Sequence, residues 1–133
     1  MLAGVPTLCC TTADVPSASI KYEGQLVVVD LAQAPHLLQT GSAGQIVDEK
    51  RKLNILIAHT EKKRFVVLNR TCTHGGGPVA YSHKRRSVQC TCWGHTEFTM
   101  SGSVMSGPAK KPLKVYEARL TGKTLEIKLE PKA

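Results

Sequence analysis

The stretches Cys72-Thr73-His74 and Cys92-Trp93-Gly94-His95 decide how this chain is interpreted. Each stretch places one thiol and one imidazole within three residues of each other, so both can serve as metal ligands. Structural zinc sites usually pair cysteine with cysteine and histidine with histidine at such short spacings. The mixed pairs therefore indicate a metal site of another kind, although a structural zinc module remains the non-redox alternative.

The residues around both pairs carry a family resemblance. Gly75-Gly76-Gly77-Pro78 follows the first pair directly, and Gly107-Pro108-Ala109 lies after the second. With these motifs the chain resembles the Rieske iron–sulfur domain family over roughly residues 54–129. The resemblance implies one Rieske-type [2Fe–2S] cluster, in which one iron takes two cysteines and the other takes two histidines. The expected cluster-binding and metal ligands are Cys72, His74, Cys92 and His95.

Cys90 lies two residues before Cys92, so either thiol is a possible ligand. The third residue after Cys92 is His95, whereas the third residue after Cys90 is Trp93. The Cys-x-x-His spacing therefore selects Cys92. The roles of Cys9, Cys10 and Cys90 stay open at this point.

Further residues are expected to form the environment of the cluster. Glycine lacks a side chain, so a glycine run beside ligands lets backbone amides approach inorganic sulfide. In the Rieske family a proline-containing loop covers the cluster, and Pro108 is the matching position. The expected environment consists of Gly75, Gly76, Gly77, Trp93, Gly94, Thr96, Phe98, Gly107 and Pro108.

The chain departs from the family pattern at three places. In members that serve quinol-oxidising complexes a disulfide joins the two ligand loops, but the matching positions here are Gly77 and Gly94. Phe98 stands nearest to a tyrosine that donates a hydrogen bond in high-potential members. Because hydrogen bonds to cluster sulfurs raise the reduction potential, we expect a value in the lower or middle part of the Rieske range.

Composition and patterning predict an all-β chain. Eleven glycines and seven prolines separate short runs of apolar and β-branched residues. The resemblance implies a stack of small antiparallel sheets with the cluster-binding loops at one tip. Strands are expected at 25–30, 45–47, 53–59, 64–69, 79–81, 87–90, 96–98, 103–105, 113–120 and 124–129, with a turn at 20–24 and one helical turn at 36–38.

A length of 133 residues is sufficient for one domain. We expect a single Rieske domain over residues 1–133, in which residues 1–18 form an irregular N-terminal extension. The cluster-binding portion covers about residues 70–110. No stretch approaches the roughly 20 apolar residues of a membrane span. The apolar start of the chain leaves two locations open, the cytoplasm or, if it is a trimmed export signal, the periplasm.

The resemblance implies one-electron transfer, either as a soluble ferredoxin or as the electron-transfer subunit of an oxidoreductase complex. The alternative is the Rieske subunit of a quinol-oxidising, cytochrome bc-like complex or of an arsenite-oxidase-like complex. No substrate-oxidising site is expected in this chain, because an oxygenase needs a further 2-His-1-carboxylate iron site. The chain is therefore expected to act with a separate redox protein.

The net charge of +8 bears on partners. Aromatic residues make up only 5% of the chain, which argues against the stacking platforms of single-strand binders and so against nucleic acid. The expected partner is a reductase, an oxygenase, a cytochrome or a quinol-oxidising complex. Basic residues at 84–86 and 110–111 are expected to lie near the cluster and to favour an acidic docking surface.

Overall fold

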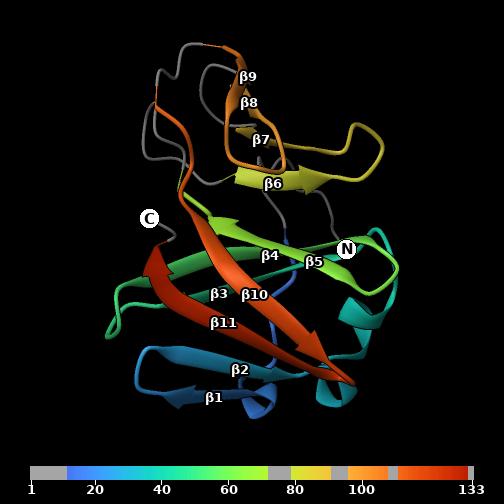
Figure 1. Cartoon of the computed structure of the whole chain (residues 1–133), viewed down its shortest axis with the longest axis vertical. Coiled ribbons are helices and arrows are strands. Elements are labelled where there is room, and N and C mark those ends of the chain that lie inside the picture. The colour runs from blue at the N-terminus through green and yellow to red at the C-terminus, as the bar shows by residue number, and fades with distance from the viewer. Residues whose placement is uncertain (1–11, 72–78, 91–95, 108–110, 132–133) are drawn as a thin grey trace, which may run out of the picture.

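The computed structural model describes residues 12–71, 79–90, 96–107 and 111–131 (Figure 1). These residues form two antiparallel sheets, one large and one small, with short 3-10 turns and no α-helix among them. The all-β prediction is confirmed, including the stack of antiparallel sheets. In the described part of the chain, no helix has the length and apolar character needed to cross a membrane.

The large sheet has the strand order β1-β2-β11-β10-β5-β4-β3. Most of its strands alternate between buried and more exposed side chains, as strands with one face on a core do. In β2, for example, Val27 and Val29 are fully buried while their neighbours are half-buried. The segment expected as a turn at 20–24 is instead a strand that pairs with β2 through a two-residue turn. The strands are β1 (Ile20–Glu23), β2 (Leu26–Asp30), β3 (Ala43–Asp48), β4 (Leu53–Glu61), β5 (Arg64–Asn69), β10 (Val115–Thr121) and β11 (Thr124–Pro131).

The small sheet has the order β6-β7-β8-β9 and lies above the large one in Figure 1. All its neighbouring strands are joined by short connections, so each pair is antiparallel. β8 is only two residues long, and its pairing with β7 consists of Val88 with Phe98 and Gln89 with Glu97. The strands are β6 (Val79–Ser82), β7 (Ser87–Cys90), β8 (Glu97–Phe98) and β9 (Val104–Ser106).

Strand β4 explains how the two sheets pack together. Its residues from Leu53 to Thr60 are almost all buried, which an alternating, half-exposed strand would not show. Ile55 and Ile57 belong to the core of the large sheet, whereas Leu56 points to the opposite face and packs with Phe98 under the small sheet. β4 therefore separates two hydrophobic cores. The small sheet packs against the buried side chains of this strand, which we call the floor strand.

Three 3-10 turns complete the fold: η1 (Ser17–Ser19), η2 (Leu31–Gln33) and η3 (Pro35–Leu38). The last confirms the expected helical turn, and Pro35 at its start supplies a backbone angle that suits this position. The small sheet is inserted between β5 and β10, which are neighbours in the large sheet. At the base of this insertion the backbone N–H of Asn69 donates to the carbonyl oxygen of Lys114 at 2.8 Å.

Candidate metal centre

The four expected ligands Cys72, His74, Cys92 and His95 lie outside the described residues. The same is true of six expected environment residues: Gly75, Gly76, Gly77, Trp93, Gly94 and Pro108. The structure does describe the residues that directly precede and follow the segments 72–78, 91–95 and 108–110. We call these segments the first, second and third loop, and their end points establish how the site is framed.

The ends of the first loop are held together by one backbone hydrogen bond. The N–H of Val79 donates to the carbonyl oxygen of Arg70 at 2.8 Å. Asn54 of β4 fixes the start of the loop, because its side-chain oxygen accepts from Nε of Arg70 at 2.8 Å and its amide group donates to Oγ1 of Thr71 at 3.3 Å. The residue before Cys72 is therefore anchored to the floor strand on one side and to Asn69 on the other, at 2.9 Å.

The second loop is closed in the same way. The N–H of Cys90 donates to the carbonyl oxygen of Thr96 at 2.8 Å, so the two residues that flank the loop are adjacent. Thr96 is fully buried. Cys90 and Thr96 thus hold the two ends of a segment that carries one expected cysteine and one expected histidine ligand.

The register of the small sheet joins the two loops. Val79, the first residue after the first loop, pairs with Cys90, the last residue before the second loop. Register partners across an antiparallel pair have Cα atoms only about 4.5–5.5 Å apart. The first ligand loop therefore ends, and the second begins, at the same end of the β6–β7 hairpin.

The third loop starts against the end of the second. Gly107 has φ +98°, and a Cβ placed on it would lie 2.5 Å from Cα of Thr96 and 2.9 Å from its Oγ1. Only glycine can approach the Thr96 backbone this closely. The residue before the third loop therefore lies against the residue after the second loop, while the role of Gly107 and Thr96 in the cluster environment stays a prediction.

This framing fits the implied cofactor. A Rieske cluster needs a cysteine and a histidine from each of two loops, and the two loops that carry these residue types start and end at one place. Within the described ranges, no other group of three or more His, Cys, Asp and Glu side chains is arranged to hold a metal ion.

Phe98 and Cys90 have a structural role that the sequence did not reveal. Both are essentially inaccessible to solvent and belong to the core under the small sheet, together with Leu56, Leu68 and Val88 among others. The ring of Phe98 fills this core directly below β7 and β8. Both residues therefore support the strands from which the second loop starts and ends.

A charged cluster beside the second loop was missed in the sequence. The carboxylate of Glu97 accepts hydrogen bonds from Nε and a terminal nitrogen of Arg85, both at 2.9 Å, and from the hydroxyl of Ser87. The hydrogen bonds from Arg85, followed by that from Ser87, lower the pKa of Glu97 to about 2. The ion pair joins the β6–β7 turn to β8, and no local spacing signals a contact between these two segments.

The basic run at 84–86 joins two strands of the small sheet, as expected. It forms the turn between β6 and β7, at the end of the hairpin opposite to Val79 and Cys90. Arg85 binds Glu97, and a terminal nitrogen of Arg86 donates to the carbonyl oxygen of Thr60 at 3.2 Å. Arg85 and Arg86 therefore make contacts within the protein, and the expected proximity of the run to the cluster stays a prediction.

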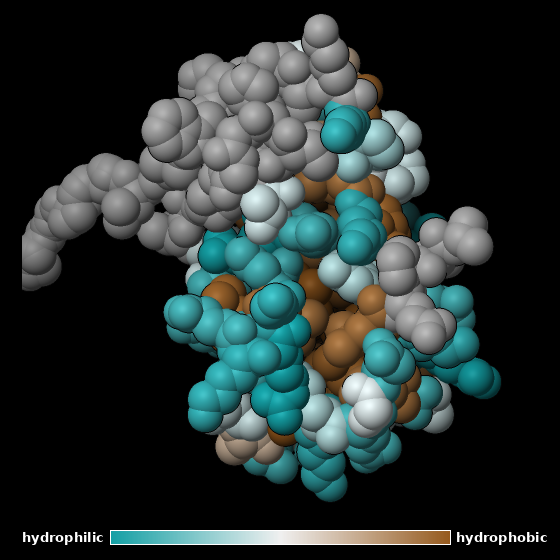
Figure 2. Space-filling model, turned by 90° about the vertical axis from the view of Figure 1, so that its left-hand side faces the viewer, coloured by the Kyte–Doolittle hydropathy of each residue, from teal (hydrophilic) through white to brown (hydrophobic). Residues whose placement is uncertain are grey.

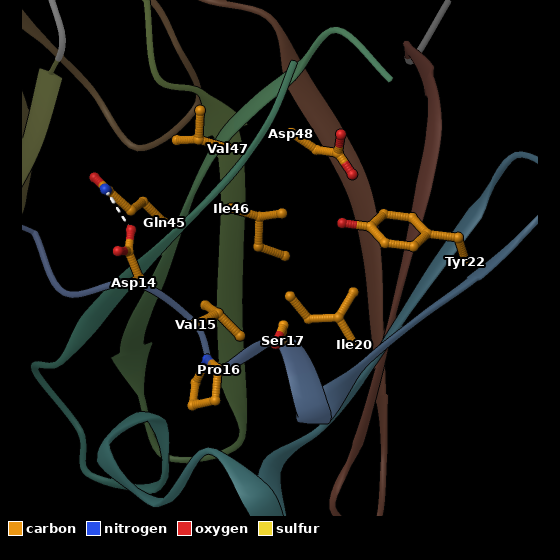
Figure 3. Close-up of a pocket in the computed structure, with 10 residues that line it drawn as sticks. All are labelled: Asp14, Val15, Pro16, Ser17, Ile20, Tyr22, Gln45, Ile46, Val47 and Asp48. Atoms are coloured by element: carbon orange, nitrogen blue, oxygen red, sulfur yellow. Dashed lines mark hydrogen bonds between the residues drawn. The ribbon is translucent and has the colours of Figure 1, made fainter. Parts of the chain in front are cut away.

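A separate cavity of about 560 Å³ lies between the edge strands β1 and β3 of the large sheet (Figure 3). Ile20 and Tyr22 face Ile46 across it. The guanidinium of Arg51 stacks over the ring of Tyr22, with Cζ 3.8 Å from the ring centroid. Figure 2 shows one face of the molecule, on which hydrophobic residues line a hollow that hydrophilic residues surround. The cavity belongs to the large sheet and not to the framing of the ligand loops.

The family model described as "Rieske [2Fe-2S] domain" matches residues 10–117. The cytochrome b6-f complex iron-sulfur subunit of Chlorobaculum thiosulfatiphilum is 28% identical over 95 residues, which cover 68% of this chain and 52% of that protein. The subunit of the same description from Chlorobaculum tepidum is 28% identical over 105 residues, which cover 79% and 54%. The chain thus spans about half the length of the curated relatives it matches.

Two solved structures share the fold. The plasma membrane Rieske protein PetC3 from Synechocystis PCC 6803 has a TM-score of 0.56 at 24% identity, over 74% of this chain and 91% of that one. A chain from the complex of reduced oxygenase and oxidized ferredoxin in carbazole 1,9a-dioxygenase has a TM-score of 0.62 at 19% identity, over 72% and 88%. These similarities support the fold assignment.

Proposed function

The chain belongs to the Rieske [2Fe–2S] domain family, and from this premise we propose that it passes single electrons between redox proteins through a cluster held by Cys72, His74, Cys92 and His95. A Rieske domain carries a Rieske-type [2Fe–2S] cluster and functions in electron transfer. The observation that supports the ligand assignment best is the pairing of Val79 with Cys90, which brings the ends of both ligand loops together.

When bound, a cluster of this type takes up and releases one electron, at a potential between about −150 and +300 mV. The residues of the chain hold the ligand loops in place so that little has to rearrange as charge moves. Asn54 anchors the residues before the first loop, Cys90 and Thr96 join the two ends of the second, and Gly107, which precedes the third, lies against Thr96. Leu56, Phe98 and their neighbours form a buried core under the small sheet, which excludes water from that side of the strands that carry the loops.

We propose that residues 1–133 form a single domain of this family, with about residues 70–110 as its cluster-binding portion. The chemistry on the partner's substrate is then supplied by the partner. Two kinds of partner complex fit this proposal. One is a reductase or oxygenase that receives electrons from a ferredoxin. The other is a quinol-oxidising complex, which is favoured by the printed description of both curated relatives as cytochrome b6-f complex subunits.

Docking to the partner is proposed to use basic charge beside the third loop rather than the β6–β7 turn. Lys111 follows the third loop directly. An acidic partner surface would then be steered toward the cluster end of the small sheet. Since the Debye length falls from about 30 Å at 0.01 M salt to about 3 Å at 1 M, the association rate should fall as salt is added. A rate of electron transfer that does not change with ionic strength would contradict this part of the proposal.

The ligand assignment is tested by electron paramagnetic resonance of the dithionite-reduced protein, together with iron and sulfide analysis. The wild-type protein should show a Rieske-type signal with two irons and two sulfides. His95→Ala and Cys92→Ser should lose the signal, whereas the matched control Cys90→Ala should retain it. An unchanged Rieske signal in either ligand variant, or loss of the signal only in Cys90→Ala, would refute the assignment.

A further inference from the structure

The Arg85–Glu97 ion pair occupies a special position relative to the proposed cluster. Glu97 is the first residue of β8, which follows the second loop after Thr96 alone. Phe98 points down into the core, so Glu97 lies on the other face of the small sheet, where Ser87 and Gln89 of β7 also lie. Only Thr96 therefore separates the ion pair from the second loop in the sequence.

The backbone alone holds β8 weakly. Only two register pairs connect β8 to β7, and the register with β9 is interrupted between Glu97 and Phe98. The carboxylate of Glu97 adds hydrogen bonds from Arg85, from Ser87 and, at 3.5 Å, from Gln89. All of these donors come from β7 or from the turn before it. Side-chain bonds therefore contribute much of the connection between β8 and the rest of the sheet.

The two charges differ in their exposure. The side chain of Glu97 is only 9% exposed, whereas that of Arg85 is 59% exposed. Charges in contact with water and salt are screened strongly, and buried charges much less. The negative charge of Glu97 would therefore act on a nearby redox centre more strongly than the positive charge of Arg85 does, and Arg85 offsets only part of it.

We propose that the Arg85–Glu97 pair is a positioning and potential-setting element of the cluster site: it fixes the exit of the second ligand loop, and its two charges act with opposite sign on the reduction potential. This inference rests on the proposed function, because it assumes that His95 of the second loop is a cluster ligand. A buried negative charge disfavours the uptake of an electron, and a positive charge favours it.

The experiment is a double-mutant cycle measured by protein-film voltammetry and by thermal unfolding. Glu97→Gln keeps the size and the hydrogen-bonding capacity of the side chain but removes its charge, and should raise the potential. Arg85→Met should lower the potential by a smaller amount. The double variant should have a potential between that of the wild type and that of Glu97→Gln, while all three variants unfold at lower temperature than the wild type.

Two further variants keep the test decisive. Arg85→Lys retains the charge but not the paired hydrogen bonds, so it should lower the unfolding temperature and leave the potential close to that of the wild type. Should Glu97→Gln fail to fold, the comparison of Arg85→Lys with Arg85→Met carries the test. Arg51→Met removes an arginine from the Arg51–Asp48 ion pair of the large sheet and is the matched control, with no shift in potential expected.

The outcomes separate the two proposals. A purely structural role predicts that Glu97→Gln and Arg85→Met move the potential in the same direction or not at all, and either result in proteins with a normal cluster spectrum overturns the inference. A wild-type protein that shows no Rieske-type spectrum after reconstitution with iron and sulfide refutes the proposed function itself.

Discussion

Gly107 lies so close to Thr96 that a Cβ on the glycine would be 2.5 Å from the Cα atom of the threonine. The neighbouring atom is backbone, so it cannot move aside as a flexible side chain can. The φ of +98° adds a conformational cost for any other residue. We predict that Gly107→Ala lowers the free energy of unfolding by on the order of 3 kcal/mol or more, measured by urea denaturation.

The control for this variant is Gly24→Ala in the β1–β2 turn. Gly24 also has a positive φ, of 63°, but a Cβ there would meet no atom within 4 Å. Gly24→Ala should therefore show only the conformational cost of a positive φ, about 1–2 kcal/mol. Equal losses in both variants would mean that the approach of Gly107 to Thr96 is not what requires the glycine.

A second prediction concerns the anchoring of the first ligand loop by Asn54. Asn54→Ala removes one hydrogen bond to Arg70 and one to Thr71, so it should cost about 2 kcal/mol of stability. Because Thr71 precedes the proposed ligand Cys72, loosening should also let the cluster escape several-fold faster. The measurement is the decay of visible absorbance in the presence of an iron chelator.

Gln45→Ala is the matched control for the anchoring experiment. Gln45 lies in β3 of the same sheet, and its amide donates to Asp14 at 2.7 Å, so the variant also loses an amide hydrogen bond. It should lower stability modestly without changing the rate of cluster loss. A similar acceleration in both variants would show that global stability, not the Asn54 anchor, controls retention.

The third prediction is the reduction potential of the wild-type protein. The ring of Phe98 is buried in the core under the small sheet and carries no hydroxyl group, so it cannot donate a hydrogen bond to the cluster. Each missing donor leaves the reduced state less stabilised. Voltammetry at pH 7 should give a value in the lower or middle part of the range of about −150 to +300 mV. A value near the top would contradict this prediction.

A fourth prediction concerns acid stability at the β3–β4 turn. Partial desolvation raises the pKa of Asp48, but the side-chain hydrogen bond from Arg51 and the backbone amides of Arg51 and Lys50 outweigh it and lower the pKa. With a lowered folded-state pKa, the stabilisation is present above the ordinary value of 3.8 and is lost as pH falls through the lowered pKa.

Asp48→Asn should therefore be less stable than the wild type at pH 7, and the difference should shrink as the pH is lowered below 3.8. Urea denaturation at a series of pH values measures it. Glu49→Gln, a change of an exposed residue in the same turn, is the control, and it should stay close to the wild type throughout. A difference for Asp48→Asn that is independent of pH would show that the carboxylate charge is not involved.

Most strands were predictable because the local pattern of apolar residues in the sequence indicates them. The alternation around Val27 and Val29 and the continuous apolar run at Ile55–Ala58 each indicated a strand, and their burial confirms these interpretations. β1 was taken for a turn, because its Lys21 and Glu23 are exposed and it is an edge strand with a weak apolar pattern. The pairing of β2 with β11 had no local signal, since the two strands are far apart in the sequence.

The framing of the site was only partly predictable. The presence of Gly107 and Thr96 in one expected environment was predicted, without their direct contact. The Arg85–Glu97 pair was not, because Arg85 lies in a charged run of a kind that usually remains in solvent. Only the register of β6, β7 and β8 brings the two residues together, and register across a sheet depends on tertiary packing. The four ligands remain a prediction from their spacing.

The hydrogen bond between Asn69 and Lys114 has a consequence for the modular architecture of the chain. Residues 70–113 leave the large sheet and return to it at two points in direct contact, so the insertion can be regarded as a cassette with its two ends side by side. A short turn that joins Asn69 to Lys114 would connect β5 to β10 as an ordinary hairpin. Conversely, the cassette could be grafted between adjacent antiparallel strands of an unrelated scaffold, provided that the scaffold offers an apolar floor like that of Leu56 and Leu68.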